Sequence, residues 1–507
     1  MFNPLKRKKM KIKSYKKQEA AKGFKLSAFN FKFALVFLLS AFCFESCKKF
    51  IDVPPPTTQL VTASVFNNDG AATSALTGIY NKMFTSAESF NMEEDDGFLS
   101  DELENYSTNA TTVQYYRNAM IAGTGTTFGP WNDAYSYIYQ ANAVISGLQA
   151  TAGVSAAVKQ QLTGEAYFIR AFWHFYLTNT YGAVPVALTT DYTVTERLFR
   201  TPRVQVLQQV IADLRTAHSL LSDKYVDASD TTVTSDRVRP TKAVALALMA
   251  RAYEYLGDYS GQNVAYYTKA DSAASAVLAN PEYSLCTNLS GANSVFLANS
   301  NEAIWQLATA LPSSTDTYEG NYFILIAAPS SGSGVSISTE LFNAFEPGDQ
   351  RKANWVGSIT AGGQTYYFPY KYKNLTYVGT EYTMVLRLAE QYLIRAEAQA
   401  HGAGNGIVGA LADLNAIRKR AGLPNYAGGT DKASVLTAIL HERQVELFTE
   451  WGARWFDLNR TGNTTAVMSV VTPLKGGTWN SDGYQELYPI PGNDMLKNSN
   501  LTQNPGY

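Results

Sequence analysis

Cysteine is scarce in this sequence, with 3 in 507 residues. Cys43 and Cys47 lie near the start, and Cys286 is alone in the rest of the chain. A chain cleaved before Cys47 and modified there could therefore form no internal disulfide bond. Long apolar runs are missing too, because no stretch of 18 apolar residues follows position 46. This predicts a body without disulfides and without a membrane-spanning helix.

Positive charge is in short supply behind residue 46. The first 46 residues hold 11 of the 42 Lys and Arg but 2 of the 43 Asp and Glu, which leaves 31 basic and 41 acidic side chains and a net charge of about −10. A surplus of negative charge argues against nucleic acid as a partner and gives no reason to expect adhesion to anionic lipid.

Motifs for catalysis are absent as well. His441 and Glu442 begin like a zinc-protease motif, but Val445 stands where the second ligand would be. No Gly-x-Ser-x-Gly elbow occurs, and Cys286 has no motif partner. Glycines 123 and 125 lack the spacing of a dinucleotide fingerprint. We therefore predict a protein that is not an enzyme and has no cofactor.

One acidic cluster could hold a metal ion, since calcium prefers several oxygen ligands. It matches no EF-hand order, so a solvated acidic loop or helix N-terminus is the favoured interpretation and no metal site is predicted. The cluster consists of Glu93, Glu94, Asp95, Asp96, Asp101, Glu102 and Glu104.

What the sequence does contain begins with a basic leader. The segment up to Lys32 carries 11 Lys and Arg, and the apolar stretch from Phe33 to Phe44 spans 12 residues, which are too few to cross a bilayer. Ser46-Cys47 follows where a small-residue cleavage site belongs, which predicts a signal peptide over 1–46 and a lipid on Cys47. The alternative is an ordinary cleaved signal with a chance cysteine, and Met10 could be the start instead of Met1.

The body shows the apolar spacing of buried helices. From Gln161 to Tyr181, apolar residues recur at i, i+3, i+4 and i+7, and Gly182 and Pro185 end the segment. Further helices are predicted in pairs, with a turn at Gly257-Asp258 inside one pair, and stacked pairs would supply the core. The predicted helical hairpins, which resemble tetratricopeptide units, cover 71–148, 161–221, 241–280 and 385–421.

Two segments differ from the helical pairs. Residues 85–130 and 283–380 are rich in Gly, Ser, Thr, Asn and Tyr, and short runs at 303–307 and 365–368 predict strands. Long irregular segments in a compact protein are usually functional. The predicted fold class is therefore mostly α, with a helical scaffold that supports a loop-rich ligand-binding region.

Eight separated blocks carry a family resemblance in one order along the chain. They resemble the SusD/RagB family of Bacteroidetes outer-membrane nutrient-uptake lipoproteins. The blocks are CKKFIDVPPP at 47–56, WNDAYSYIYQAN at 131–142, GEAYFIRAFWHFYLTNTYGAVPV at 164–186, RPTKAVALALMARAYEYLGDY at 239–259, LRLAEQYLIRAEAQA at 386–400, ALADLNAIRKRAGL at 410–423, ERQVELFTEWGARWFDLNRTG at 442–462 and LYPIPGNDMLKNSNLTQNPGY at 487–507.

The resemblance implies a single SusD-like fold over 47–507, lipid-anchored at the outer membrane and exposed on the cell surface. It also implies a partner, a TonB-dependent outer-membrane barrel, on which the lipoprotein sits as a lid. The substrate class it implies is a glycan or oligosaccharide. Relatives like RagB take peptides, so a peptide ligand stays open, as does a lid or assembly subunit with few substrate contacts.

Charged residues within the family blocks lie on or beside apolar helical faces. Since a buried Arg needs a carboxylate, we expect ion pairs between neighbouring hairpins instead of ligand contacts. The residues are Arg170, Arg251, Arg395, Glu397, Arg418, Arg443, Glu446, Arg454 and Asp457. At similar spacing, Trp131, Trp173 and Trp455 are expected in the core, as is Trp305.

Ligand contacts are expected from aromatic residues of the irregular segments. Flat rings bind the C–H faces of sugars, and amide, carboxylate or guanidinium groups bind the hydroxyl rim. Alternatively, these rings pack the loops onto the scaffold. The candidates are Tyr106, Tyr318, Tyr322, Trp355, Tyr366 and Tyr367, with Asn321 and Arg351 as polar neighbours.

Overall fold

The computed structural model describes residues 65–507 except 124, 126–127, 309–312 and 333. The predicted signal peptide and Cys47 lie outside the described residues. Helices dominate the described part, which confirms the mostly α class. No described helix is both long and apolar enough to cross a membrane.

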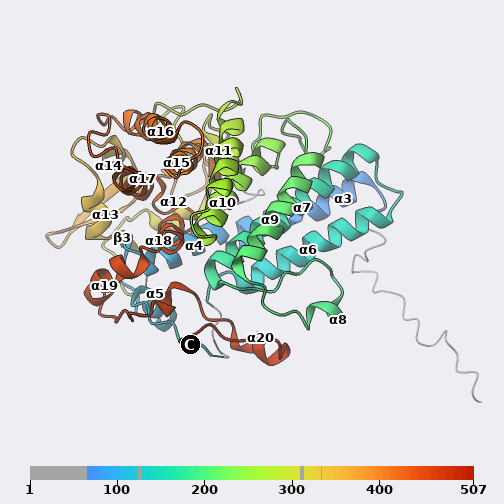
Figure 1. The fold of residues 1–507 in the computed structure, drawn as a ribbon, viewed down its shortest axis with the longest axis horizontal. Coiled ribbons are helices and arrows are strands. Elements are labelled where there is room, and N and C mark those ends of the chain that lie inside the picture. The colour runs from blue at the N-terminus through green and yellow to red at the C-terminus, as the bar shows by residue number, and fades with distance from the viewer. Residues whose placement is uncertain (1–64, 124, 126–127, 309–312, 333) are drawn as a thin grey trace, which may run out of the picture. The chain divides into compact units, whose positions relative to one another are not determined.

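Four helical pairs form the scaffold, and they follow one another across the molecule (Figure 1). Each helix buries its apolar stripe against its partner and the next pair, which is how short helices gain a shared core. The pairs are α3 (Asp69–Thr85) with α6 (Trp131–Ala150), α7 (Ala156–Tyr181) with α9 (Arg203–Leu220), α10 (Lys242–Tyr259) with α11 (Val264–Leu278), and α15 (Leu388–Ala400) with α16 (Gly406–Arg420).

The remaining helices are shorter or cap the ends of the array. The longest of them, α17 (Lys432–Leu447), packs on α15 and α16. The others are α4 (Glu88–Leu99), α5 (Ala110–Tyr116), α8 (Tyr192–Thr195), α12 (Tyr318–Phe323), α13 (Thr339–Ala344), α14 (Gln350–Trp355), α18 (Ala453–Arg460), α19 (Thr464–Leu474) and α20 (Gly492–Lys497).

Six short strands form three antiparallel pairs within the described residues. β1 (Leu103–Asn105) pairs with β3 (Val335–Ile337), and β2 (Ala303–Leu307) pairs with β6 (Thr383–Arg387). β4 (Val356–Ala361) and β5 (Gln364–Pro369) form a hairpin whose two turn residues, Gly362 and Gly363, have φ of 60° and 83°. This backbone favours glycine, and it matches the twist of the strands. The strands predicted at 303–307 and 365–368 are confirmed.

Ion pairs join helices between neighbouring pairs, as expected, and also within a pair. Between pairs, Arg251 of α10 contacts Glu390 of α15 at 2.6 Å. Arg170 of α7 contacts Asp213 of α9 at 2.6 Å, and Arg395 contacts Asp413 across α15 and α16 at 2.7 Å. The predicted core tryptophans are also confirmed: Trp131, Trp173, Trp305 and Trp455 are all buried. A charge buried among helices needs an opposite charge nearby. Each arginine of the set has a carboxylate partner in the structure.

Two predictions about elements are wrong. The turn predicted at Gly257-Asp258 is helical, because α10 continues to Tyr259. A Cβ on Gly257 would lie 2.8 Å from the Tyr267 ring, so this glycine permits close packing of α10 and α11 instead of a turn. The segment 85–130 is not mainly irregular either, since it contains α4 and α5.

Candidate functional site

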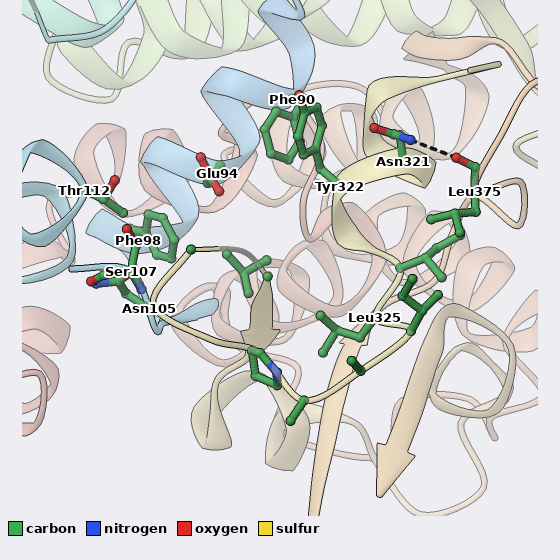
Figure 2. A pocket seen from close by; sticks show the side chains of 18 of the residues that line it. Phe90, Glu94, Phe98, Asn105, Ser107, Thr112, Asn321, Tyr322, Leu325 and Leu375 are labelled. Carbon is green, nitrogen blue, oxygen red and sulfur yellow. Dashed lines mark hydrogen bonds between the residues drawn. The ribbon is translucent and has the colours of Figure 1, made fainter. Parts of the chain in front are cut away.

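A cavity of about 550 Å³ lies between α4 and α12, and we call it the α4–α12 cavity. Further lining comes from the loop after β1, from Thr112 of α5, from residues 324–329 and from Leu375 (Figure 2). Its volume falls within the range of ligand pockets in proteins. Both segments that were predicted to be loop-rich contribute to it.

The sequence of α4 places three side chains on the cavity. Phe90, Glu94 and Phe98 are spaced by four residues, so they project from one face of the helix. Figure 2 shows all three directed toward the cavity, with Glu94 between the two rings. Burial raises the pKa of the half-buried Glu94 to about 7. The carboxyl group can therefore donate or accept a hydrogen bond near neutral pH.

Aromatic rings from α4 and α12 stack at the cavity edge. The rings of Phe90 and Tyr322 are 4.7 Å apart at 22°, and Tyr318 lies parallel to Tyr322 at 6.2 Å. Phe90 is buried, whereas Tyr322 is 52% exposed. The stack thus fixes the orientation of a ring that still has surface available to a ligand.

Polar groups accompany the rings. The Asn321 amide nitrogen donates to the Leu375 carbonyl at 2.9 Å (Figure 2), and its side-chain oxygen accepts no hydrogen bond from the described residues. Asn105 exchanges two hydrogen bonds with the Ser107 backbone and so holds the loop after β1 in place. The arrangement offers rings, amides, hydroxyls and one carboxyl group to a neutral, hydroxyl-rich molecule.

The predicted candidates divide into three groups. Tyr322 and Asn321 line the cavity, and Tyr318 supports it from behind while donating to the Thr85 carbonyl at 3.3 Å. The rings of Tyr106 and Tyr366 pack edge to face with their centroids 5.9 Å apart, and neither residue lines the cavity. Tyr367 stacks on Phe342 at 4.0 Å. These two contacts, which involve three of the candidates, match the alternative in which loop rings are used for packing.

Trp355 and Arg351 are wrong as ligand contacts, because both are 0% exposed. They are four residues apart on α14, so both face the interior. Trp355 donates from Nε1 to the Leu289 carbonyl at 2.9 Å. Arg351 is occupied by carboxylates: Asp349 at 2.8 Å, Glu442 at 2.6 Å and Glu446 at 2.9 Å.

The acidic cluster is not a solvated loop, which corrects the favoured interpretation. Glu93, Asp96 and Glu102 are each 2% exposed. The acidic residues of α4 lie in two different places. Glu94 lines the α4–α12 cavity, whereas Asp95 and Asp96 line a separate, smaller cavity. Outside the helix, Asp101 pairs with Arg454 at 2.8 Å, Glu102 accepts from the Thr449 backbone and Glu104 from the Tyr116 hydroxyl.

The sequence reasoning missed Phe90, Glu94 and Phe98. The available signal was their spacing of four, which is helical, inside a segment whose composition indicated a loop. A short helix with polar residues between its aromatic residues gives only a weak periodic pattern. The polar composition of the segment therefore favoured the prediction of a loop.

Comparison with known proteins gives consistent matches. A family model described as "SusD family" matches residues 351–507, and one described as "Starch-binding associating with outer membrane" matches residues 49–254. Among curated proteins, "SusD-like protein P2" of Formosa agariphila is 26% identical over 74% of this chain and 80% of its own length. "Starch-binding protein SusD" of Bacteroides thetaiotaomicron is 36% identical over 26% of this chain and 22% of its own.

Solved structures share the fold. A SusD superfamily protein from Bacteroides vulgatus superposes with a TM-score of 0.73 at 18% identity, covering 87% of this chain and 100% of its own. A structure titled "Laminarin binding SusD-like protein" gives a TM-score of 0.68 at 24% identity, with coverage of 87% and 100%. At such identities, the likeness establishes the architecture only.

Proposed function

Because the chain belongs to the SusD/RagB family, we propose that it captures a glycan or oligosaccharide in the α4–α12 cavity and delivers it to a TonB-dependent outer-membrane barrel. The observation that carries the binding proposal is the Phe90–Tyr322 stack beside Asn321 and Glu94. A fixed ring fits the apolar face of a sugar, and the amide and carboxyl groups fit its hydroxyls. Relatives named for starch and laminarin support the same class of ligand.

The test is calorimetry of Tyr322→Ala. We titrate the purified protein with oligosaccharides of starch and laminarin, and with peptides as the competing class. Loss of the ring should weaken glycan binding by about 1–2 kcal/mol. Thermal stability should change little, because Tyr322 is half exposed.

Tyr192→Ala is the matched control, since Tyr192 is 72% exposed and does not line the cavity. This variant should bind as the unmodified protein does. Unchanged affinity in Tyr322→Ala would refute the assigned site. Binding of peptides but not of glycans would replace the substrate class with that of the RagB-like relatives.

We further propose that the chain acts at the outer membrane as a binding subunit without turnover. One family description links relatives to the outer membrane, which supports this location. Affinity purification from membranes under mild detergent should recover a barrel transporter together with the chain. Recovery of the chain alone would favour a binding protein that works without such a partner.

A further inference from the structure

A second cavity, of about 240 Å³, borders a different face of α4, and we call it the acidic cavity. Glu88, Asp95 and Asp96 reach it from α4, and Asp133 reaches it from α6. Spacings of seven and eight residues place the α4 acids on one face, turned away from that of Phe90 and Phe98. Asn91 lines both cavities, so the two adjoin along the helix.

The carboxyl groups of the acidic cavity have little positive charge around them. Among the described residues, no Lys or Arg forms an ion pair with Glu88, Asp95 or Asp96, and Asp133 has only a partly exposed contact with Lys82 at 3.7 Å. Elsewhere in the fold, arginine lies against buried acids, as Arg251 does on Glu390 at 2.6 Å. A concave site with several acids and no cation attracts one.

Tyrosine hydroxyl groups donate hydrogen bonds to two of these carboxyl groups, which offsets only part of the free-energy cost of burying them. Tyr137 donates to Glu88 at 2.8 Å and Tyr488 donates to Asp96 at 2.7 Å. Burial nevertheless raises the pKa of Glu88 and of Asp96 to about 8, so both groups are mostly protonated at neutral pH until a cation arrives.

Thr180 provides an independent sign of a ligand. It lies near the end of α7, lines the acidic cavity and is 1% exposed. Its hydroxyl has no hydrogen-bond partner among the described residues. A buried hydroxyl is rarely left without a partner, because the lost hydrogen bond costs free energy.

The geometry favours an organic cation over a bare metal ion. Within the described residues, the one group of three possible ligands that converges within 4.8 Å is Asp258, Glu397 and His401, which lies elsewhere and already contacts Arg460. The carboxyl groups of the acidic cavity are spread more widely. A volume of about 240 Å³ equals that of roughly eight water molecules, which suits a small organic group.

We propose that the acidic cavity binds a protonated primary amine, and that the amine belongs to an amino sugar of the glycan held in the neighbouring cavity. The choice of an amino sugar rests on the proposed function, whereas the amine site does not. Because Asn91 borders both cavities, one glycan can place a sugar ring against Tyr322 and the amine of a neighbouring sugar among the acids.

The experiment compares two oligosaccharides that differ only at nitrogen. Calorimetry of the purified full chain at pH 7 uses glucosamine oligomers and their N-acetylated forms, in which the amine is replaced by a neutral amide. We expect the free amine to bind at least tenfold more tightly. Asp95→Asn should remove that preference, and Asp133→Asn, on another helix, should reduce it.

Matched controls separate this proposal from the proposed function. Asp482→Asn removes an exposed acid outside the cavity and should retain the tenfold preference. Tyr322→Ala should weaken both oligomers equally. Equal binding of the two oligomers by the unmodified protein overturns the amine site and leaves glycan binding intact. A preference that persists while Tyr322→Ala has no effect supports the amine site and overturns the assignment of the α4–α12 cavity.

Discussion

Individual residues could be predicted best where their chemistry demands one kind of partner. Arginines within apolar stripes were expected to pair with acids, and Arg170 and Arg395 do so. Exposed and buried aromatic residues do not differ in sequence, so Tyr322 and Trp355 were equivalent candidates although one is 52% exposed and the other 0%. The difference depends on α14, which has six residues and is too short to show a period.

At the residue scale, the buried position of Arg351 leads to a stability prediction. Replacing Arg351 with Ala leaves Asp349 without a cation among the described residues, whereas Glu442 keeps Arg418 at 3.4 Å and Glu446 keeps Arg387 at 2.6 Å. The free energy of unfolding should fall by about 3–5 kcal/mol, because uncompensated buried charge is costly. Denaturant titration measures the change.

Arg197→Ala is the control: Arg197 is 77% exposed, and its pair with Glu196 should contribute about 1 kcal/mol or less. Similar losses in the two variants would contradict the structural role of Arg351.

At the scale of elements, α4 shows where sequence reasoning ends. Repeated apolar residues predicted the long scaffold helices, because burial against a partner imposes a strong period. On α4, different faces meet two cavities and the scaffold, so polar and apolar residues mix and no stripe forms. The spacing of four between Phe90, Glu94 and Phe98 was therefore a weak signal, and the neighbours in the fold are what make the helix evident. Its acids also depend on those neighbours for their pKa values.

The burial of the α4 acids predicts a dependence of stability on pH. The pKa of Asp96 rises to about 8 in the folded state, whereas an unfolded aspartate ionises near 3.8. Between these values the unfolded chain loses a proton that the folded chain keeps, so stability from this group falls as pH rises from about 4 to about 8. The substitution Asp96→Asn replaces the ionisable carboxyl group with a neutral amide, whose oxygen can still accept the hydrogen bond from the Tyr488 hydroxyl. The variant should unfold like the unmodified protein at pH 4 and be more stable at pH 8, by up to about 5 kcal/mol.

The pH experiment uses chemical denaturation at both pH values. Titration of the groups around Asp96 must be considered together: Glu88 and Asp95 on α4, Asp133 on α6 and Lys82 on α3 remain in both proteins. Comparing the variant with the unmodified protein at each pH cancels their contribution. A variant that is destabilised at pH 8 would show that Asp96 is ionised in the folded state.

At the scale of the whole molecule, we predict that the leader and Cys47 anchor the chain. The basic segment, the apolar stretch from Phe33 to Phe44 and Ser46-Cys47 have the order of a lipoprotein signal. A diacylglycerol together with an N-linked acyl chain holds a protein more firmly than a single chain, which binds only marginally. Cys47→Ala should therefore shift the chain from the membrane fraction to the soluble fraction. The test requires cells that lack the proposed partner barrel, because such a barrel could itself retain the protein. Cys43→Ala is the matched control and should remain at the membrane, since it removes a cysteine but keeps the predicted acceptor. If Cys47→Ala still fractionates with the outer membrane in those cells, the chain is not anchored through a lipid on this residue.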